Sequence, residues 1–179
     1  MKNILLLGAT GSIGKSVLSV ISQNKEDLNL YGISFNKSID RGKEIIREFS
    51  PSFAYIDDVN CFNDQSNLKE CTFLNGDVEL EELIKNDYVD IIICATSGFA
   101  GLKATYIAAG TGKKILIANK ESIVAGGDLI LPLAKERNSE IVPIDSEHNA
   151  IFQCLSGEKG IEDIQKVTIT ASGGPFINK

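Results

Sequence analysis

The sequence predicts an α/β protein with a Rossmann-like, doubly wound parallel sheet. Two observations carry this prediction. Short apolar runs alternate with helical patterns along the whole chain, and a glycine-rich turn follows the first apolar run directly. This alternation is typical of a parallel sheet with helices on both faces.

The first half of the sheet is predicted from apolar runs that are separated by helical patterns. A buried strand at Ile4–Leu7 leads into the glycine turn, and a helix is expected from Ser12 to Gln23. Ser38 is suited to be the N-cap of the next helix, and Pro51 ends it. The other strands expected in this half are Leu28–Ser34, Phe53–Ile56 and Cys71–Leu74, and the polar stretch between the last two has no assignment.

In the second half, Val89–Ala95 is an apolar run that predicts a central strand. A helix is expected over Glu121–Arg137, although Gly126-Gly127 weakens its middle. The remaining expected elements are helices at Val78–Ile84, Phe99–Ala109 and Asn149–Leu155, and strands at Lys114–Ala118, Ile141–Ile144 and Val167–Ala171.

Composition narrows the class of protein. The 179 residues are 43% hydrophobic and 23% charged, which is typical of a soluble globular protein. The net charge of −6 argues against nucleic acid or an anionic membrane as the main partner. The first apolar run is too short for a secretion signal, and no segment is long enough to span a bilayer. The four cysteines lack CxxC spacing, so reduced thiols and a cytoplasmic location are expected.

The glycine turn predicts a dinucleotide site. Gly8, Gly11 and Gly14 are spaced as G-x-x-G-x-x-G between a strand and a helix. Such glycines permit a tight turn and let a pyrophosphate approach the N–H groups at the start of the helix. The alternative is a purely structural glycine turn.

The end of the second strand favours NADP over NAD. NAD sites usually place a carboxylate there for the ribose 2′-hydroxyl, but this chain has Asn36-Lys37-Ser38. The Lys37 ammonium suits a 2′-phosphate. The alternative is that Lys37 is only a solvated charge before a helix.

Asp145 and Glu147 form a candidate metal site. They are separated by one residue at the end of a predicted strand, so both carboxylates can point to one side. Two hard oxygen donors suit Mg²⁺ or Mn²⁺. The alternative is that Asp145 caps the following helix and Glu147 complements its dipole.

Two further strand ends have polar residues. Lys120 follows the strand at Lys114–Ala118, where it can neutralise or donate to a substrate oxygen, with Glu121 as its partner. The alternative is a capping turn with Asn119 as the N-cap. Ala95-Thr96-Ser97-Gly98 either lines the nicotinamide side of the crevice or is a helix cap made by Ser97.

Four segments together resemble the 1-deoxy-D-xylulose 5-phosphate reductoisomerases: residues 8–14, 118–122, 145–153 and 171–176. The resemblance extends over the whole chain. It implies an oxidoreductase of the non-mevalonate isoprenoid pathway that depends on NADPH and on magnesium or manganese. Such an enzyme isomerises 1-deoxy-D-xylulose 5-phosphate and reduces the product to 2-C-methyl-D-erythritol 4-phosphate. It also implies a homodimer and a small phosphorylated, sugar-like substrate.

The resemblance assigns roles residue by residue. Lys120 and Glu147 are expected to be catalytic, and Asp145 and Glu147 to bind the metal. Many relatives read Gly-Lys-Asn where this chain has Asn36-Lys37-Ser38, so only Lys37 carries over cleanly there. The expected nucleotide-binding residues are Thr10, Gly11, Ser12, Ile13, Asn36, Lys37, Ser38, Asn119 and Glu121, and the expected substrate-binding residues are Lys120, Ser146, Glu147 and Ser172.

Similar enzymes are about twice as long, so this chain is expected to correspond to their first domain and the beginning of the next one. Residues 1–145 are expected to form the NADPH-binding domain, and residues 146–179 the start of an α/β catalytic domain. We expect this portion to bind NADPH but to be inactive alone. Two other functions fit the residues: a non-catalytic NADP-binding sensor, and a two-domain NADPH reductase that needs no metal.

Overall fold

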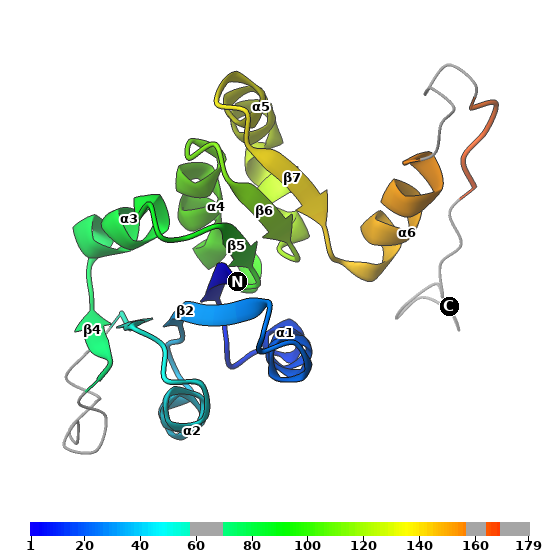
Figure 1. Cartoon of the computed structure of the whole chain (residues 1–179). Coiled ribbons are helices and arrows are strands. Elements are labelled where there is room, and N and C mark those ends of the chain that lie inside the picture. The colour runs from blue at the N-terminus through cyan, green and yellow to red at the C-terminus, as the bar shows by residue number, and fades with distance from the viewer. Residues whose placement is uncertain (58–69, 157–163, 169–179) are drawn as a thin grey trace, which may run out of the picture. The chain divides into compact units, whose positions relative to one another are not determined.

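The computed structural model describes residues 1–57, 70–156 and 164–168. The chain divides into two compact units, Met1–Asp145 and Ser146–Lys179, and each is described by itself. In the described part of the first unit, seven parallel strands form one sheet in the order β4-β3-β2-β1-β5-β6-β7 (Figure 1). The strands are β1 Lys2–Leu7, β2 Leu28–Ser34, β3 Phe53–Tyr55, β4 Thr72–Leu74, β5 Ile91–Cys94, β6 Lys114–Ile117 and β7 Glu140–Pro143.

Helices cover both faces of this sheet, with α1 and α2 on one side and α3, α4 and α5 on the other (Figure 1). Strand β1 shows why. Ile4 and Leu6 pack in the core beneath α1 and α2, whereas Leu5 and Leu7 pack in the core beneath α3 and α4. Because neighbouring side chains of a strand point to opposite faces, an uninterrupted apolar run buries both faces at once. The helices are α1 Ser12–Gln23, α2 Ile39–Phe49, α3 Asp77–Lys85, α4 Leu102–Ala109 and α5 Lys120–Glu136.

The strand order reverses between β1 and β5. From β1 the chain proceeds outward through β2 and β3 to β4, and it then returns to pair β5 with the other side of β1. In open α/β sheets, ligands bind outside the carboxyl ends of the strands at such a switch point. The predicted doubly wound parallel fold is therefore confirmed, and it directs attention to the loops after β1, β2 and β5.

Within the first unit, the helices expected over Phe99–Ala109 and Glu121–Arg137 differ from the structure in detail. The helix expected from Phe99 begins as a 3₁₀ turn at Gly98–Gly101, labelled η2, before α4 starts at Leu102. Helix α5 runs unbroken through Gly126-Gly127. A Cβ on Gly126 would lie 2.8 Å from Leu102 Cδ1, so this glycine allows α4 and α5 to pack closely.

In the second unit, helix α6 spans Ser146–Leu155, so it begins at Ser146 and not at the expected Asn149. The strand expected at Val167–Ala171 is not formed where the structure describes it. Residues 164–168 have no regular secondary structure, Val167 is 52% exposed, and residues 169–171 lie outside the described part. An apolar run becomes a strand only when a neighbouring strand pairs with it. Among the described residues, no helix combines the length and apolar character that crossing a membrane requires.

Candidate nucleotide-binding and catalytic site

A cavity of about 450 Å³ lies at the carboxyl ends of β1, β2, β3 and β5. Its position is the one that the switch point predicts for a nucleotide. Its lining combines backbone of the glycine turn, polar side chains after β2 and apolar side chains. The lining residues are Leu7, Gly8, Thr10, Gly11, Ser34, Phe35, Asn36, Lys37, Ser38, Tyr55, Asp57, Leu80, Ala95, Thr96, Ser97, Ala100 and Ala104.

The glycine turn is shaped by close backbone contacts. Gly8 has a φ of +89°, and a Cβ there would lie 2.6 Å from the Ala95 carbonyl oxygen. A Cβ on Gly14 would lie 2.4 Å from the Ala9 carbonyl oxygen. The Gly8 N–H donates to Ser34 Oγ at 3.0 Å, so the end of β2 holds the turn in place. Glycine is therefore required at positions 8 and 14 for the turn itself, whatever binds there.

The start of α1 presents free N–H groups to an anion. Gly11 is the N-cap of α1, and no side chain caps this helix end. Thr10 and Gly11 line the cavity, and Ser12 and Ile13 follow in the first turn of the helix. The first N–H groups of a helix have no partner within it, and the helix dipole favours negative charge there. This arrangement suits a pyrophosphate.

Asn36, Lys37 and Ser38 are all exposed and all line the cavity. Ser38 occupies the N-cap position of α2, as expected, but its hydroxyl makes no capping hydrogen bond. Asn36 Nδ2 donates to Asp57 Oδ2 at 2.5 Å. The Lys37 ammonium thus lies at the edge of the cavity formed by the end of β2, where the sequence predicts a 2′-phosphate.

Among the lining residues that sequence reasoning did not single out are Tyr55, Asp57 and Leu80. Tyr55 ends β3, and Asp57 follows two residues later. Burial raises the pKa of Tyr55 to about 12, and the negative charge of Asp57 and a hydrogen bond with it add to this effect. The signal that could have found Tyr55 and Asp57 is their place at the end of the third strand, beside the end of the second.

Asn119 is 2% exposed and does not line the cavity. Its Oδ1 accepts from the Ser122 N–H at 2.8 Å and from Ser122 Oγ at 2.9 Å, which confirms the N-cap alternative. Its Nδ2 donates to the carbonyl oxygens of Thr96 and Gly98, the latter at 2.8 Å. Asn119 therefore ties the loop after β5, which lines the cavity, to the start of α5.

Lys120 and Asp145 lie together in the first unit. Lys120 Nζ is 3.1 Å from Asp145 Oδ2, and the Asp145 side chain is 16% exposed. Lys120 follows β6 and Asp145 follows β7, and these strands are neighbours, so both residues lie at the same edge of the sheet. Glu121 is exposed in the first turn of α5 and does not line the cavity.

In the second unit, Ser146 and Glu147 are exposed in the first turn of α6. Ser146 Oγ donates to Glu147 Oε2 at 2.7 Å. Ser172, the remaining predicted substrate-binding residue, lies outside the described residues. Within the described ranges, no three His, Cys, Asp or Glu side chains gather as a metal-binding group. Asp145 and Glu147 remain a predicted pair of ligands.

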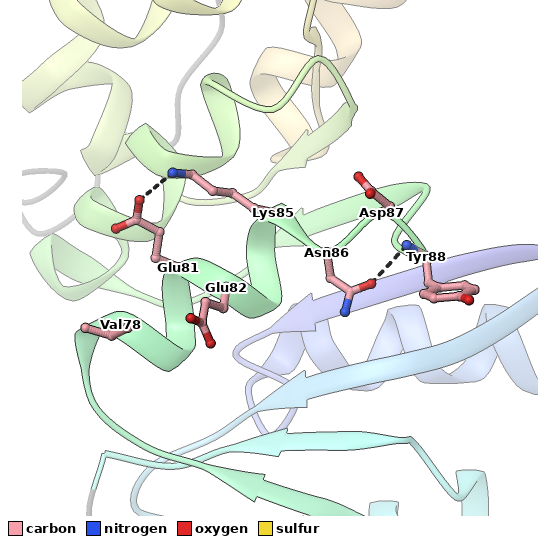
Figure 2. A pocket seen from close by; sticks show the side chains of 7 residues that line it. All are labelled: Val78, Glu81, Glu82, Lys85, Asn86, Asp87 and Tyr88. Atoms are coloured by element: carbon pink, nitrogen blue, oxygen red, sulfur yellow. Dashed lines mark hydrogen bonds and ion pairs between the residues drawn. The ribbon is translucent and has the colours of Figure 1, made fainter.

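A second hollow, of about 690 Å³, is formed by α3 and the turn that leads into β5 (Figure 2). Because this turn precedes β5, it lies at the amino ends of the strands, opposite to the cavity that the glycine turn lines. Two contacts join neighbouring residues of its lining: Lys85 pairs with Glu81, and the Tyr88 N–H donates to Asn86 Oδ1. None of the predicted site residues lines it, and its lining consists of Val78, Glu81, Glu82, Lys85, Asn86, Asp87 and Tyr88.

Comparison with known proteins gives one consistent result. The family model described as 1-deoxy-D-xylulose 5-phosphate reductoisomerase matches residues 4–127, and the model of the C-terminal domain of that enzyme matches residues 141–179. The chain is 42% identical over 184 residues to the reductoisomerase of Clostridium botulinum (strain 657 / Type Ba4), covering 98% of this chain and 47% of the relative. It is also 42% identical over 179 residues to that of Francisella tularensis subsp. novicida, covering 98% and 46%.

Solved structures agree. The enzyme from Zymomonas mobilis in complex with NADPH superposes with a TM-score of 0.90 at 34% identity, covering 99% of this chain and 47% of that one. A reductoisomerase in complex with NADPH, fosmidomycin and magnesium gives a TM-score of 0.82 at 38% identity, covering 87% and 39%. The chain spans about half the length of the curated relatives it matches. With family models accounting for both parts of the chain and the same fold in solved relatives, this chain belongs to the 1-deoxy-D-xylulose 5-phosphate reductoisomerase family.

Proposed function

We propose that the chain takes part in the NADPH-dependent conversion of 1-deoxy-D-xylulose 5-phosphate to 2-C-methyl-D-erythritol 4-phosphate, a step of isoprenoid biosynthesis. The observation that carries this proposal is the cavity at the switch point, where the glycine turn and Lys37 meet. Membership of the family supports it, as do the relatives that are described in complex with NADPH.

In the proposed complex, different residues of the first unit bind different parts of the cofactor. The backbone of Thr10, Gly11, Ser12 and Ile13 receives the pyrophosphate at the start of α1. Lys37 neutralises the 2′-phosphate, with Asn36 and Ser38 beside it. Asn119 holds the loop at Thr96 and Gly98 in place, and Glu121 lies in the first turn of α5.

Asp145 and Glu147 are the proposed ligands of a divalent cation. Carboxylates are the donors that Mg²⁺ and Mn²⁺ prefer, and two of them leave coordination positions open for oxygens of the substrate. When bound, the cation supplies Lewis acidity to the ketone and hydroxyl oxygens of the substrate, and NADPH supplies the hydride. A relative described in complex with magnesium supports this choice of cation.

The residues around that site hold and orient the substrate. Lys120 keeps a positive charge beside Asp145, where it can donate to a substrate oxygen. Ser146 holds the carboxylate of Glu147 by a hydrogen bond, which fixes the orientation of this proposed catalytic group. Ser172 is proposed as a further contact to the substrate. Use of manganese, a homodimer and a cytoplasmic location are part of the same proposal.

Titration calorimetry with NADPH, NADH and Mn²⁺ tests the binding part of this proposal on the chain itself. We expect NADPH to bind more tightly than NADH, and Mn²⁺ binding to be lost in Asp145→Asn and Glu147→Gln. Glu140→Gln is the matched control, because Glu140 is an exposed carboxylate that pairs with Lys114. Equal affinities for both dinucleotides, or unchanged Mn²⁺ binding in both variants, would contradict the proposal.

The reaction is tested by following the loss of NADPH absorbance with 1-deoxy-D-xylulose 5-phosphate and Mg²⁺, in the protein that contains this chain together with the rest of the reductoisomerase sequence. We expect turnover that a chelator abolishes. Turnover that persists in a chelator would favour a metal-independent reductase, and NADPH binding without any turnover of the complete protein would favour a sensor.

A further inference from the structure

The nucleotide cavity extends beyond Lys37 to the end of β3. The strands β1, β2 and β3 are successive neighbours, so their carboxyl ends present the glycine turn, then Asn36 and Lys37, then Asp57. Neighbouring parallel strands are about 4.8 Å apart, so this series covers about 10 Å. A nucleotide whose pyrophosphate lies at α1 and whose 2′-phosphate lies at Lys37 has its base at the end of β3. We call this end of the cavity, which Tyr55, Asp57 and Leu80 line, the third position.

The third position is built for a flat ring with a hydrogen-bond donor at its edge. Tyr55, which is 8% exposed, and Leu80 of α3 supply apolar surface to the cavity there. Asp57 supplies a carboxylate, which in its ionised form only accepts hydrogen bonds. Adenine has such an exocyclic amine, whereas hypoxanthine has a carbonyl oxygen at the same place.

The carboxylate of Asp57 is held in position by its neighbours. Asn36 Nδ2 donates to Asp57 Oδ2 at 2.5 Å across the ends of β2 and β3, and Tyr55 hydrogen-bonds the same carboxylate. A carboxylate has room for about four hydrogen bonds on its two oxygens. These two contacts therefore orient Asp57 and leave it able to accept another donor.

We propose that Asp57 determines the choice of base in the cofactor by accepting a hydrogen bond from the exocyclic amine of adenine, and that Asn36 is the positioning residue for this carboxylate. The inference rests on the proposed binding of NADPH in this cavity. It gives Asn36 a role that involves no contact with phosphate. Recognition of the base would also explain why a carboxylate lies in a cavity that otherwise suits a phosphorylated ligand. The positive charge of Lys37, which lines the same cavity, offsets the negative charge of Asp57.

The test compares NADPH with its hypoxanthine analogue by titration calorimetry on the chain. The unchanged chain is expected to bind NADPH about tenfold more tightly, because hypoxanthine turns its carbonyl oxygen toward the carboxylate. In Asp57→Ala the ratio of the two affinities should fall to about one, mainly through weaker binding of NADPH. Asp57→Asn should also bring the ratio near one, since an amide can accept from one base and donate to the other.

Asp128→Asn is the matched control, because it removes one exposed negative charge from α5, outside the cavity. It should keep the full preference for adenine. Thermal unfolding followed by circular dichroism shows whether each variant is folded. The ratio of the two affinities in the unchanged chain tests the inference even if a variant does not fold. A ratio of one in the unchanged chain, or an unchanged ratio in both Asp57 variants, would overturn the inference while leaving NADPH binding intact. A chain that binds neither dinucleotide would overturn the proposed function as well.

The same variants distinguish a hydrogen bond between Asp57 and the base from one between Asp57 and the ribose. If Asp57 accepted from a ribose 2′-hydroxyl, Asp57→Ala would weaken NADH selectively and leave the ratio of adenine to hypoxanthine unchanged. That result would also overturn the inference.

Discussion

Among single residues, Lys37 contributes most directly to the proposed cofactor preference. It is exposed, lines the cavity and follows β2, where NAD-specific sites place a carboxylate. A charge at this position acts on one chemical group of the cofactor. Its effect should therefore appear in the comparison of NADPH with NADH and not in the stability of the fold.

Lys37→Gln should weaken NADPH binding about tenfold, because a charge-assisted contact to phosphate is lost, and leave NADH binding nearly unchanged. Titration calorimetry with both dinucleotides measures this. Lys135→Gln is a suitable control, since Lys135 lies in the last turn of α5 and does not line the cavity. An equal loss for both dinucleotides would show that Lys37 does not read the 2′-phosphate.

Asn119 acts through its neighbours. Replacing it by alanine leaves the carbonyl oxygens of Thr96 and Gly98 and the N–H of Ser122 without this partner. We expect the free energy of unfolding to fall by about 2–3 kcal/mol, because buried polar groups are costly to leave unpaired. Urea denaturation measures this change.

Asn119→Asp distinguishes the two sides of the amide. It preserves the acceptor for Ser122 but turns an oxygen toward two carbonyl oxygens, so it should weaken NADPH binding through displacement of the loop at Thr96. Ser122→Ala, which removes only a hydroxyl donor to Asn119, serves as the comparison. If Asn119→Asp bound NADPH as the unchanged chain does, Asn119 would not position this loop.

At the level of elements, the functional unit is β1, the glycine turn and α1. The side chains of β1 pack into the hydrophobic cores on both faces of the sheet, and this fixes the start of the turn. The positive φ of Gly8 then reverses the chain so that α1 begins at the cavity. Ser34 at the end of β2 accepts from the Gly8 N–H. The turn therefore depends on two strands, and strain in it should affect both stability and binding.

Gly8→Ala should lower the free energy of unfolding by more than about 2 kcal/mol, because a side chain at positive φ is strained and its Cβ would overlap the backbone at Ala95. NADPH affinity should fall as well. Gly127→Ala is the control: a Cβ there meets Ile123 Cγ2 at an ordinary 3.6 Å, so we expect a gain of about 0.5–1 kcal/mol within α5. Urea denaturation of both variants checks these signs. Unchanged stability in Gly8→Ala would show that the turn can relax.

At the scale of the whole molecule, three buried acidic groups of the described residues link stability to alkaline pH. Burial raises the pKa of Cys94 from 9.0 to about 11 and that of Cys71 from 9.0 to about 12, while burial and Asp57 raise that of Tyr55 from 10.0 to about 12. All three favour the neutral form in the folded state. Their contribution to stability is therefore fully present below about pH 9 and is lost as the pH rises toward the raised values.

The free energy of unfolding should accordingly decrease steadily above about pH 9, measured by urea denaturation at a series of pH values. Cys94→Ala should show a shallower decrease than the unchanged chain, because one of the three groups is gone, even though its stability at neutral pH is lower. A pH dependence that is the same in both chains would contradict the role of Cys94.

Much of this molecule could be predicted from the sequence because the determining interactions are local. The bounds expected for the helix at Ser12–Gln23 and the strand at Leu28–Ser34 agree with α1 and β2, since periodicity, turn chemistry and apolar runs act over a few residues. The sequence also predicted that the glycine turn faces a crevice at the carboxyl ends of the strands, and the turn does line a cavity there.

Tertiary structure decided the features that depend on which strands become neighbours. Asp57 reaches Asn36, and Lys120 reaches Asp145, only because β3 pairs with β2 and β7 pairs with β6. The burial of Asn119 likewise depends on a loop from another strand. Strand order arises from burying two apolar faces over the whole sheet, a property of the assembled core that no short segment of the sequence contains.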